Sequence, residues 1–254
     1  MTGRLQGKRA LIYGGASGLG FACAAAMIGE GAAVFLSGRR AERLAQAVEK
    51  LSAKDRAGYE AGDASLEADV QRVTKAAVKF LRGLDTMVIS AGTAGITPIL
   101  STSLEEFRAI CDGNLTSTFL ACRYGAPHLV ENGSGSIIAI SSIFGLVGEV
   151  ERVGYCASKH GVIGLVRAAA LDLAGKGVRV NALCPGFVET ELSLEMVSRA
   201  SDPQAALHKR RTMHPIPRSG LTEEIAEAAV YLASDRAAWT TGQAIAIDGG
   251  YTAR

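Results

Sequence analysis

The chain is poor in the residues from which disulfide, metal and nucleic-acid sites are built. Its five cysteines, Cys23, Cys111, Cys122, Cys156 and Cys184, are scattered and form no CxxC pair, and its four histidines show no metal-ligand spacing. Neither a disulfide framework nor a zinc site is indicated, and we expect no metal. Free thiols are typical of a reducing compartment, so we expect the protein in the cytoplasm.

Charge is too evenly balanced to indicate a polyanionic partner. The 254 residues include 27 Lys and Arg and 25 Asp and Glu, a net charge of +2, without a dense basic block. We therefore expect no nucleic-acid partner. Residues 10–29 contain no charged side chain and are long enough to span a bilayer. Their glycines indicate instead a strand, a turn and a helix inside a soluble protein, so we expect no membrane contact.

A glycine-rich turn follows the first predicted strand. Gly14, Gly18 and Gly20 lie between that strand and a helix predicted for 21–30, and a second strand is predicted at 33–37. A turn without side chains lets backbone N–H groups approach a pyrophosphate at a helix N-terminus. A glycine turn alone is a weak signal, but the order strand, turn, helix and strand predicts a dinucleotide-binding unit.

The end of the second predicted strand indicates the choice of cofactor. NAD-binding units usually carry an acidic residue there, which holds the ribose 2′-hydroxyl. This chain has Gly38 and Arg39 instead, and a guanidinium beside a glycine favours a 2′-phosphate. We therefore predict NADP(H), with NAD(H) possible. The alternative is that Arg39 and Arg40 only begin a solvated helix at 41–53.

Strands and helices continue to alternate along the chain, and 48% of the residues are apolar, enough for a large core. Further strands are predicted at 58–61, 85–89, 136–141, 178–184 and 243–247, with helices at 66–81, 104–129, about 155–174 and 223–234. Repeated βαβ units predict a three-layer, doubly wound parallel α/β fold, the Rossmann fold, of about seven strands with helices on both faces. Thr222 is the predicted N-cap of the last helix.

Residues 187–218 break this rhythm. They form a long connection at the edge where the strands end, and such connections often close over a ligand. We expect one domain over residues 1–254 with a substrate lid at about 187–218. A disordered insertion is the alternative.

Tyr155 and Lys159 are the candidate catalytic pair. They are four positions apart, so they share one face of a helix. An ammonium near a phenol lowers the pKa of the phenol, which would allow Tyr155 to exchange a proton near neutral pH. Ser142, after the preceding strand, can supply a hydroxyl beside it. Such a pair also occurs by chance on helix surfaces, so the prediction depends on the other motifs.

These motifs resemble the short-chain dehydrogenase/reductase family, in its single-domain branch of about this length, over essentially the whole chain. The family's Tyr-x3-Lys motif matches Tyr155 and Lys159, and its serine thirteen residues earlier matches Ser142 rather than Ser141. Its helix asparagine matches Asn114. The resemblance implies that Asn114, Ser142, Tyr155 and Lys159 are catalytic, with Asn114 keeping a water near Lys159.

The resemblance also implies the cofactor contacts. They are expected from Gly14, Ser17, Gly18, Leu19, Gly20, Gly38, Arg39, Asp63, Ala64, Ser90, Ala91, Gly92, Tyr155, Lys159, Pro185, Gly186, Val188 and Thr190. Two departures affect this set: Tyr13 replaces the family's threonine before the glycines, and residues 89–92 read Ile-Ser-Ala-Gly instead of Asn-Asn-Ala-Gly. Both put the hydrogen bonding of the glycine turn in question, but not the fold.

The expected activity is hydride transfer between NADP(H) and a small or mid-sized carbonyl or secondary alcohol, by a homotetramer. The alternatives are an NAD-dependent alcohol dehydrogenase of the same family and a non-catalytic nucleotide-binding protein. An enoyl reductase is disfavoured by the short Tyr–Lys spacing. We expect a mainly apolar substrate pocket, with candidates Ile96, Phe144, Val147, Phe187 and Leu192, and with Glu149, Glu151 and Arg152 at its rim.

Overall fold

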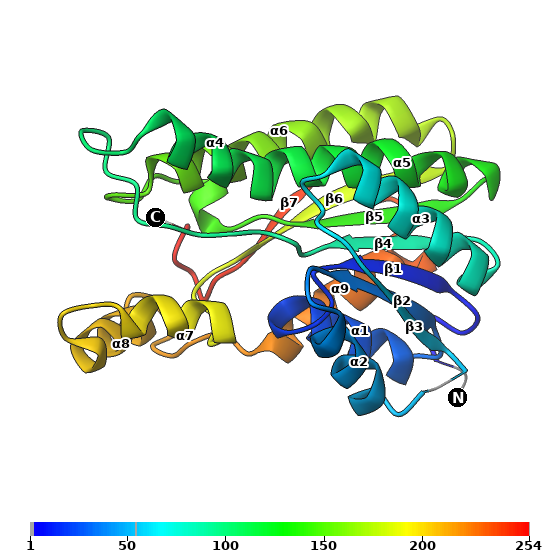
Figure 1. Ribbon diagram of the computed structural model, residues 1–254, viewed down its shortest axis with the longest axis horizontal. Coiled ribbons are helices and arrows are strands. Elements are labelled where there is room, and N and C mark those ends of the chain that lie inside the picture. The colour runs from blue at the N-terminus through cyan, green and yellow to red at the C-terminus, as the bar shows by residue number, and fades with distance from the viewer. Residues whose placement is uncertain (1–2, 54, 254) are drawn as a thin grey trace.

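The computed structural model describes residues 3–53 and 55–253 and contains one sheet of seven parallel strands (Figure 1). The strand order is β3-β2-β1-β4-β5-β6-β7. The strands are β1 (Arg9–Tyr13), β2 (Ala33–Gly38), β3 (Ala57–Ala61), β4 (Thr86–Ile89), β5 (Gly135–Ile140), β6 (Val178–Pro185) and β7 (Ala244–Ile247). The predicted doubly wound parallel sheet is confirmed.

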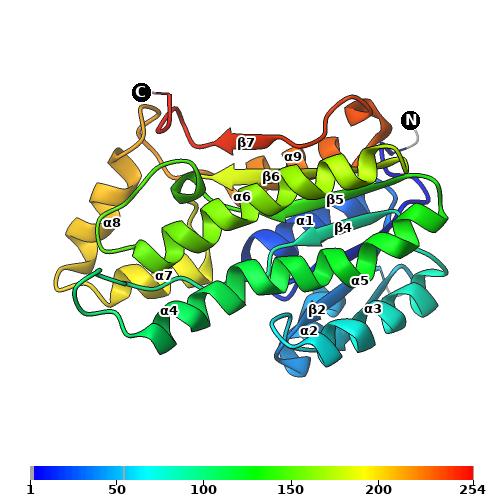
Figure 2. The same ribbon diagram turned by 90° about the horizontal axis from the view of Figure 1, so that it is seen from above.

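Helices cover both faces of the sheet (Figures 1 and 2). One face packs against α3, α5 and α6, and the other packs against α1, α2 and α9. The helices are α1 (Gly18–Gly29), α2 (Ala41–Lys50), α3 (Glu67–Leu81), α4 (Leu104–Cys111), α5 (Ser117–Glu131), α6 (Val153–Ala174), α7 (Glu191–Ser198), α8 (Pro203–Thr212) and α9 (Thr222–Ala233).

Inner strands such as β1 and β4 therefore bury both of their faces, which explains their nearly continuous apolar runs in the sequence. In β1, Leu11 and Tyr13 belong to the core under α3 and α5, while Ala10 and Ile12 belong to the core over α1 and α9. All four residues are at most 1% exposed. Successive side chains point to opposite faces of a strand, so one short segment supports two separate cores.

The strand order reverses direction between β1 and β4, and both strands end at the same edge. Tyr13 of β1 is in register with Ile89 of β4 and with Ser37 of β2. In an open parallel sheet, the crevice for a ligand lies beyond the carboxyl ends of strands at such a reversal. The topology therefore brings the glycine turn after β1 next to the segment after β4.

The predicted helix at 104–129 is wrong as a single helix. It is divided into α4 and α5 by a turn of π-helix, η1 (Asp112–Thr116), which contains Asn114. Single π-helical turns cost hydrogen-bond geometry and often lie at functional sites. Here the buried Asn114 side chain makes long-range hydrogen bonds, which the local sequence pattern does not reveal.

Further helix boundaries differ from the prediction, and the helix predicted at 41–53 ends at Lys50. Thr222 is the first helical residue of α9, and Leu221 is the N-cap. The Glu224 carboxylate accepts the Leu221 N–H at 2.8 Å and also pairs with Arg218, so the cap comes from an acid inside the helix. The N-terminal helix begins at Gly18 rather than at residue 21.

The uncharged segment 10–29 is divided between β1, the glycine turn and α1. Within the described ranges, no helix is both long and apolar enough to cross a membrane.

Candidate active site

One large cleft, of about 1250 Å³, lies at the edge where β1, β2, β4, β5 and β6 end. All predicted cofactor residues except Gly20 line it, and so do the four predicted catalytic residues. Gly20 has a different role, because a Cβ there would lie 2.2 Å from the Gly14 carbonyl oxygen. Glycine at position 20 lets α1 start directly against the turn.

The glycine turn has the backbone conformation that a close ligand approach requires. Gly14 has φ +76°, and a Cβ at this position would lie 2.6 Å from the Ala91 nitrogen. Ser17 is the N-cap of α1, but its side chain makes no capping hydrogen bond. The first N–H groups of a helix lack partners within the helix. The start of α1 therefore offers donors to an anion such as a pyrophosphate.

Tyr13, the main departure from the family motif, does not disturb this turn. The Tyr13 side chain lies on the face of the sheet that packs against α3. Its hydroxyl hydrogen-bonds the Thr74 hydroxyl of that helix at 2.8 Å. The Ser90 N–H donates to the Tyr13 carbonyl at 2.9 Å, and the Gly14 N–H donates to the Ser37 carbonyl at 2.8 Å. Main-chain hydrogen bonds thus connect the turn to β2 and β4, although the threonine hydroxyl of the family motif is missing.

The residues after β2 form the basic end of the cleft. Arg39 and Arg40 are exposed, and no acidic group of the described residues lies within ion-pair distance of either. Arg43 pairs with Glu191 of α7 at 2.6 Å. The nearest atom to a Cβ built on Gly38 would be 3.8 Å away, so the protein has no steric need for glycine there. The space beside Arg39 is therefore open to a ligand.

Asp63 is fixed at the end of β3. One of its carboxylate oxygens accepts hydrogen bonds from the Ser65 N–H at 2.9 Å and from the Ser65 hydroxyl at 2.7 Å. Its own N–H donates to Asp69 at 2.8 Å. This turn holds the carboxylate at the wall of the cleft, where the adenine contact is expected.

Lys159 is buried beside the predicted tyrosine. Its Nζ donates to the Ile140 carbonyl at 2.9 Å and lies 5.7 Å from the centre of the Tyr155 ring. Burial lowers the pKa of Lys159 to about 8. A Cβ on Gly92 would lie 3.6 Å from this Nζ and 2.7 Å from the Asn114 Oδ1, so glycine leaves room for both groups.

The expected lowering of the Tyr155 pKa is wrong for this structure. Burial raises the pKa of the phenol, and this effect outweighs the hydrogen bond from Ser142 and the nearby Arg152 charge, which act in the opposite direction. The ammonium of Lys159 is directed at the Ile140 carbonyl instead. Tyr155 therefore ionises less readily in this structure than a free phenol does.

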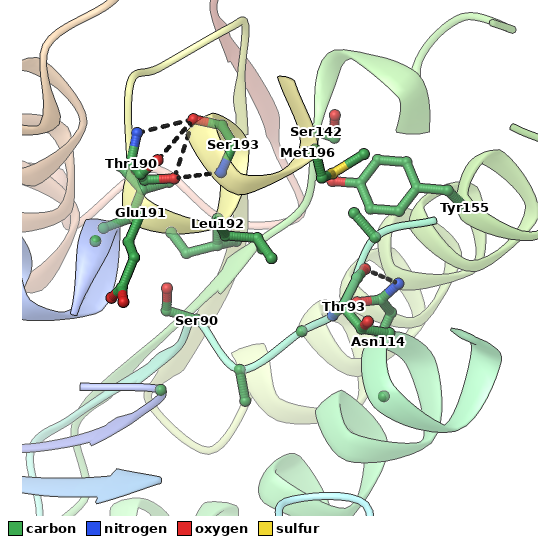
Figure 3. Close-up of a pocket in the computed structure, with 18 of the residues that line it drawn as sticks. Ser90, Thr93, Asn114, Ser142, Tyr155, Thr190, Glu191, Leu192, Ser193 and Met196 are labelled. Atoms are coloured by element: carbon green, nitrogen blue, oxygen red, sulfur yellow. Dashed lines mark hydrogen bonds between the residues drawn. The ribbon is translucent and has the colours of Figure 1, made fainter. Parts of the chain in front are cut away.

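The two adjacent serines have different roles. Ser142 interacts with the Tyr155 hydroxyl and accepts the Phe144 N–H at 3.2 Å. Ser141 donates to the Lys159 carbonyl at 3.0 Å and supports the backbone of α6. The geometry agrees with the choice of Ser142. Figure 3 shows Ser142 and Tyr155 facing the same part of the cleft, with Asn114 bonded to Thr93 below them.

Asn114 positions its neighbours. Its Oδ1 accepts the Thr93 N–H at 2.9 Å, and its Nδ2 donates to the Thr93 carbonyl and to the Ser158 hydroxyl, both at 3.0 Å. Ser158 in turn donates to the Tyr155 carbonyl at 2.8 Å. The side chain thus connects the segment after β4 to the helix that carries Tyr155.

Only some of the predicted substrate-pocket residues line the substrate end of the cleft. Ile96, Phe144, Phe187, Leu192 and Arg152 line it, but Val147, Glu149 and Glu151 do not. Glu149 and Glu151 line a separate pocket of about 420 Å³ instead. The predicted set lacks lining residues from α7, α8 and the residue that follows each helix, namely Glu191, Ser193, Glu195, Met196, Arg199, Ala206, Arg210 and Met213. Helical periodicity within 187–218 is the signal that could have located them.

Comparison with known proteins identifies the family. The family model described as enoyl-(acyl carrier protein) reductase matches residues 14–252. A glucose 1-dehydrogenase of Gluconobacter oxydans is 36% identical, over 98% of this chain and 93% of its own. A 2,5-dichloro-2,5-cyclohexadiene-1,4-diol dehydrogenase of Sphingobium indicum is 38% identical over 98% of each chain.

A solved structure gives the same result. The crystal structure of an actinorhodin polyketide ketoreductase variant with NADPH has a TM-score of 0.92 and 30% identity, with 99% of each chain covered. Together with the seven-stranded parallel sheet, these similarities show that the chain belongs to the short-chain dehydrogenase/reductase family, as an NAD(P)-dependent oxidoreductase of alcohols or ketones.

Proposed function

We propose that the protein transfers hydride between NADP(H) and a small or mid-sized ketone or secondary alcohol, with Tyr155 as general acid and base. The observation that carries the proposal is the meeting of Tyr155, Ser142 and the buried Lys159 in the same cleft as the glycine turn. When bound, the nicotinamide supplies or accepts the hydride.

The dinucleotide fits the residues that line the other end of the cleft. The open N–H groups at the start of α1 suit the pyrophosphate, and Asp63 suits the adenine edge. Arg39 would hold the 2′-phosphate, since Gly38 leaves space and no acidic side chain. The ketoreductase neighbour described with NADPH supports this choice.

The residues around Tyr155 would control one proton. In the reductive direction, Tyr155 gives its proton to the carbonyl oxygen, and Ser142 hydrogen-bonds that oxygen and orients it. Burial raises the pKa of Tyr155, so the phenol carries its proton at neutral pH as a free phenol does. Lys159 would hold the nicotinamide ribose, and Asn114 would position a water on the proton route.

Replacing Tyr155 tests this role directly. Tyr155→Phe removes only the hydroxyl, and we expect turnover to fall by about 10²- to 10⁴-fold while NADPH binding is kept. Ketone reduction and nicotinamide fluorescence measure the two quantities. Tyr231→Phe is the matched control, because this hydroxyl lies on α9 and contacts Thr240 at 3.4 Å. Undiminished turnover in Tyr155→Phe would exclude the assignment.

The oxidative direction of the reaction, from alcohol to ketone, also has support. Both relatives reported above are named dehydrogenases, which favours alcohol oxidation, with NAD(H) as the alternative cofactor. Initial rates with NADPH, NADH and their oxidised forms separate these possibilities. The matching family model is described as an enoyl reductase, but Tyr155 and Lys159 are only four positions apart, which favours a carbonyl rather than a C=C substrate.

Residues 187–218 are proposed as the substrate lid. Both helices of this segment line the cleft, and Glu191 of α7 pairs with Arg43 of α2. This ion pair joins the segment to the cofactor end.

A homotetramer is proposed because Phe119 on α5 and Leu171 on α6 are 51% and 83% exposed. The five free thiols support a cytoplasmic location.

A further inference from the structure

Two arginines contributed by different elements face the substrate end of the cleft. Arg152 is the N-cap of α6, three residues before Tyr155, and Arg210 lies on α8. Both line the cleft, and both are half-buried. Arg152 is held in place by a hydrogen bond from its Nη1 to the Gly95 carbonyl at 2.6 Å. A fixed guanidinium therefore lies beside the proposed proton donor.

Neither arginine forms an ion pair with any residue that the structure describes. The Arg210 Nη1 has only a long contact to the Met213 sulfur, at 4.0 Å. Other arginines of the same cleft are neutralised, since Arg43 pairs with Glu191 and Arg199 pairs with Glu195, each at 2.6 Å. Arg39 and Arg40 at the cofactor end are also unpaired, so Arg152 and Arg210 are the arginines without an ion pair at the substrate end of the cleft, among the described residues.

The charge of Arg152 is only weakly compensated. Glu149 attracts it from outside the cleft, because Glu149 lines the separate pocket on the other side of Arg152. Arg210 is near enough to repel it, and burial and this repulsion both lower the pKa of Arg152. Half-buried like charges without a counterion are unfavourable unless a ligand supplies the opposite charge.

We propose that Arg152 and Arg210 form a subsite for an anionic group of the substrate. The inference deepens the proposed function and rests on it. Guanidinium groups bind carboxylate and phosphate oxygens through charge-assisted hydrogen bonds. Apolar side chains also line this end of the cleft, Phe144, Leu192 and Met196 among them. The substrate class is therefore an oxo acid or hydroxy acid with an apolar body, and not the mainly apolar molecule expected from the sequence.

The first test compares anionic ketones with their neutral esters. We would measure kcat/KM for 4-oxopentanoate and its methyl ester, and for 2-oxopropylphosphonate and its dimethyl ester. A preference for the anion of about tenfold or more is expected, because each anion finds two otherwise unpaired cations. The two pairs distinguish a carboxylate from a phosphoryl group as the preferred anion.

Substitutions then assign the preference to the two arginines. Arg152→Met and Arg210→Met keep the apolar stem and remove the charge, and each should lower the anion-to-ester ratio by about tenfold. Lys209→Met is the matched control, since Lys209 is exposed, precedes Arg210 on α8 and loses the same charge. Its ratio should stay within about twofold of the wild type. Thermal denaturation shows whether each variant is folded.

Direct binding separates this inference from the proposed function. Calorimetric titration with 4-oxopentanoate and with its methyl ester, with and without NADP⁺, needs no turnover. If no carbonyl is turned over but Arg210→Met still loses acid binding, the proposed function fails and the subsite stands. If neutral ketones are reduced but acid and ester bind equally, the subsite is wrong. Equal anion-to-ester ratios of kcat/KM in Arg210→Met and Lys209→Met would also overturn the proposed subsite.

Discussion

At the scale of single residues, the packing of the protein does not require glycine at position 38. The nearest atoms to an added Cβ would be 3.8 and 3.9 Å away, so larger side chains fit. Glycine elsewhere in the cleft is required by the backbone, as Gly14 shows with its positive φ. The missing side chain at position 38 is therefore explained best by the ligand, next to the exposed Arg39.

We therefore predict a reversal of cofactor preference in Gly38→Asp. We expect NADPH to bind at least about tenfold more weakly, because a carboxylate repels the 2′-phosphate, while NADH binding is kept or improved. Fluorescence titration with both nucleotides provides the measurement.

Gly38→Ala controls for size, since it adds a Cβ without charge. Equal losses in the Ala and Asp variants would mean that bulk, not charge, decides. Unchanged NADPH affinity in Gly38→Asp would show that Arg39 does not read the phosphate.

At the scale of elements, the π-helical turn η1 is the feature that joins fold and chemistry. It places Asn114, 1% exposed, where its side chain reaches Thr93 after β4 and Ser158 in α6. Regular α-helical geometry through residues 104–131 would not include this five-residue turn. Tertiary hydrogen bonds thus connect the irregular turn to α6, the helix that carries Tyr155.

We therefore expect Asn114→Ala to destabilise the protein by about 1–3 kcal/mol, because it breaks three hydrogen bonds and leaves partly buried partners unsatisfied. Turnover should fall as well, since Tyr155 loses its indirect support through Ser158. Chemical denaturation and ketone reduction give both values.

Thr116→Ala is the control within the same turn. Thr116 makes one hydrogen bond, to Asp112 at 3.0 Å on the exposed side, so its loss should change stability by less than about 0.5 kcal/mol. If both variants were equally stable, the bonds of Asn114 would not hold the turn.

At the scale of the whole molecule, one sheet brings distant segments of the chain to one cleft. The glycine turn after β1 and the start of α6 are more than 100 residues apart in the sequence. Both line the same cleft as the segment after β4. The outer helices keep exposed apolar side chains, such as Phe119 and Leu171, and Trp239, in the segment between α9 and β7, is 100% exposed. Water-exposed side chains of this size favour assembly with further copies.

We predict a homotetramer in solution. Sedimentation equilibrium should give about four times the mass of the 26.4 kDa chain. Leu171→Lys places a charge at an 83% exposed position of α6 and should shift the mass towards smaller species if this helix lies in an interface. Lys176→Glu, just beyond the end of α6, controls for a change of charge at that helix. A wild-type monomer would contradict the prediction.

The sequence by itself determined the fold class and most of the site. All seven strands have both ends within one residue of the prediction, because their apolar runs meet glycine or polar residues there. Local signals were sufficient because buried parallel strands are continuous apolar runs. Ser142 and Lys159, which were predicted from their spacing from Tyr155 and from the family resemblance, line the same cleft as Tyr155.

Only the tertiary structure decided the remaining features. The division of 104–129 by η1, the direction of the Tyr155 pKa and the inward position of Arg210 all depend on partners far away in the chain. Burial is a property of the packed molecule, and desolvation determines the proton affinity of Tyr155 more than the lysine four positions away. The chemistry of the cleft therefore follows from residue types, but its electrostatics follow from packing.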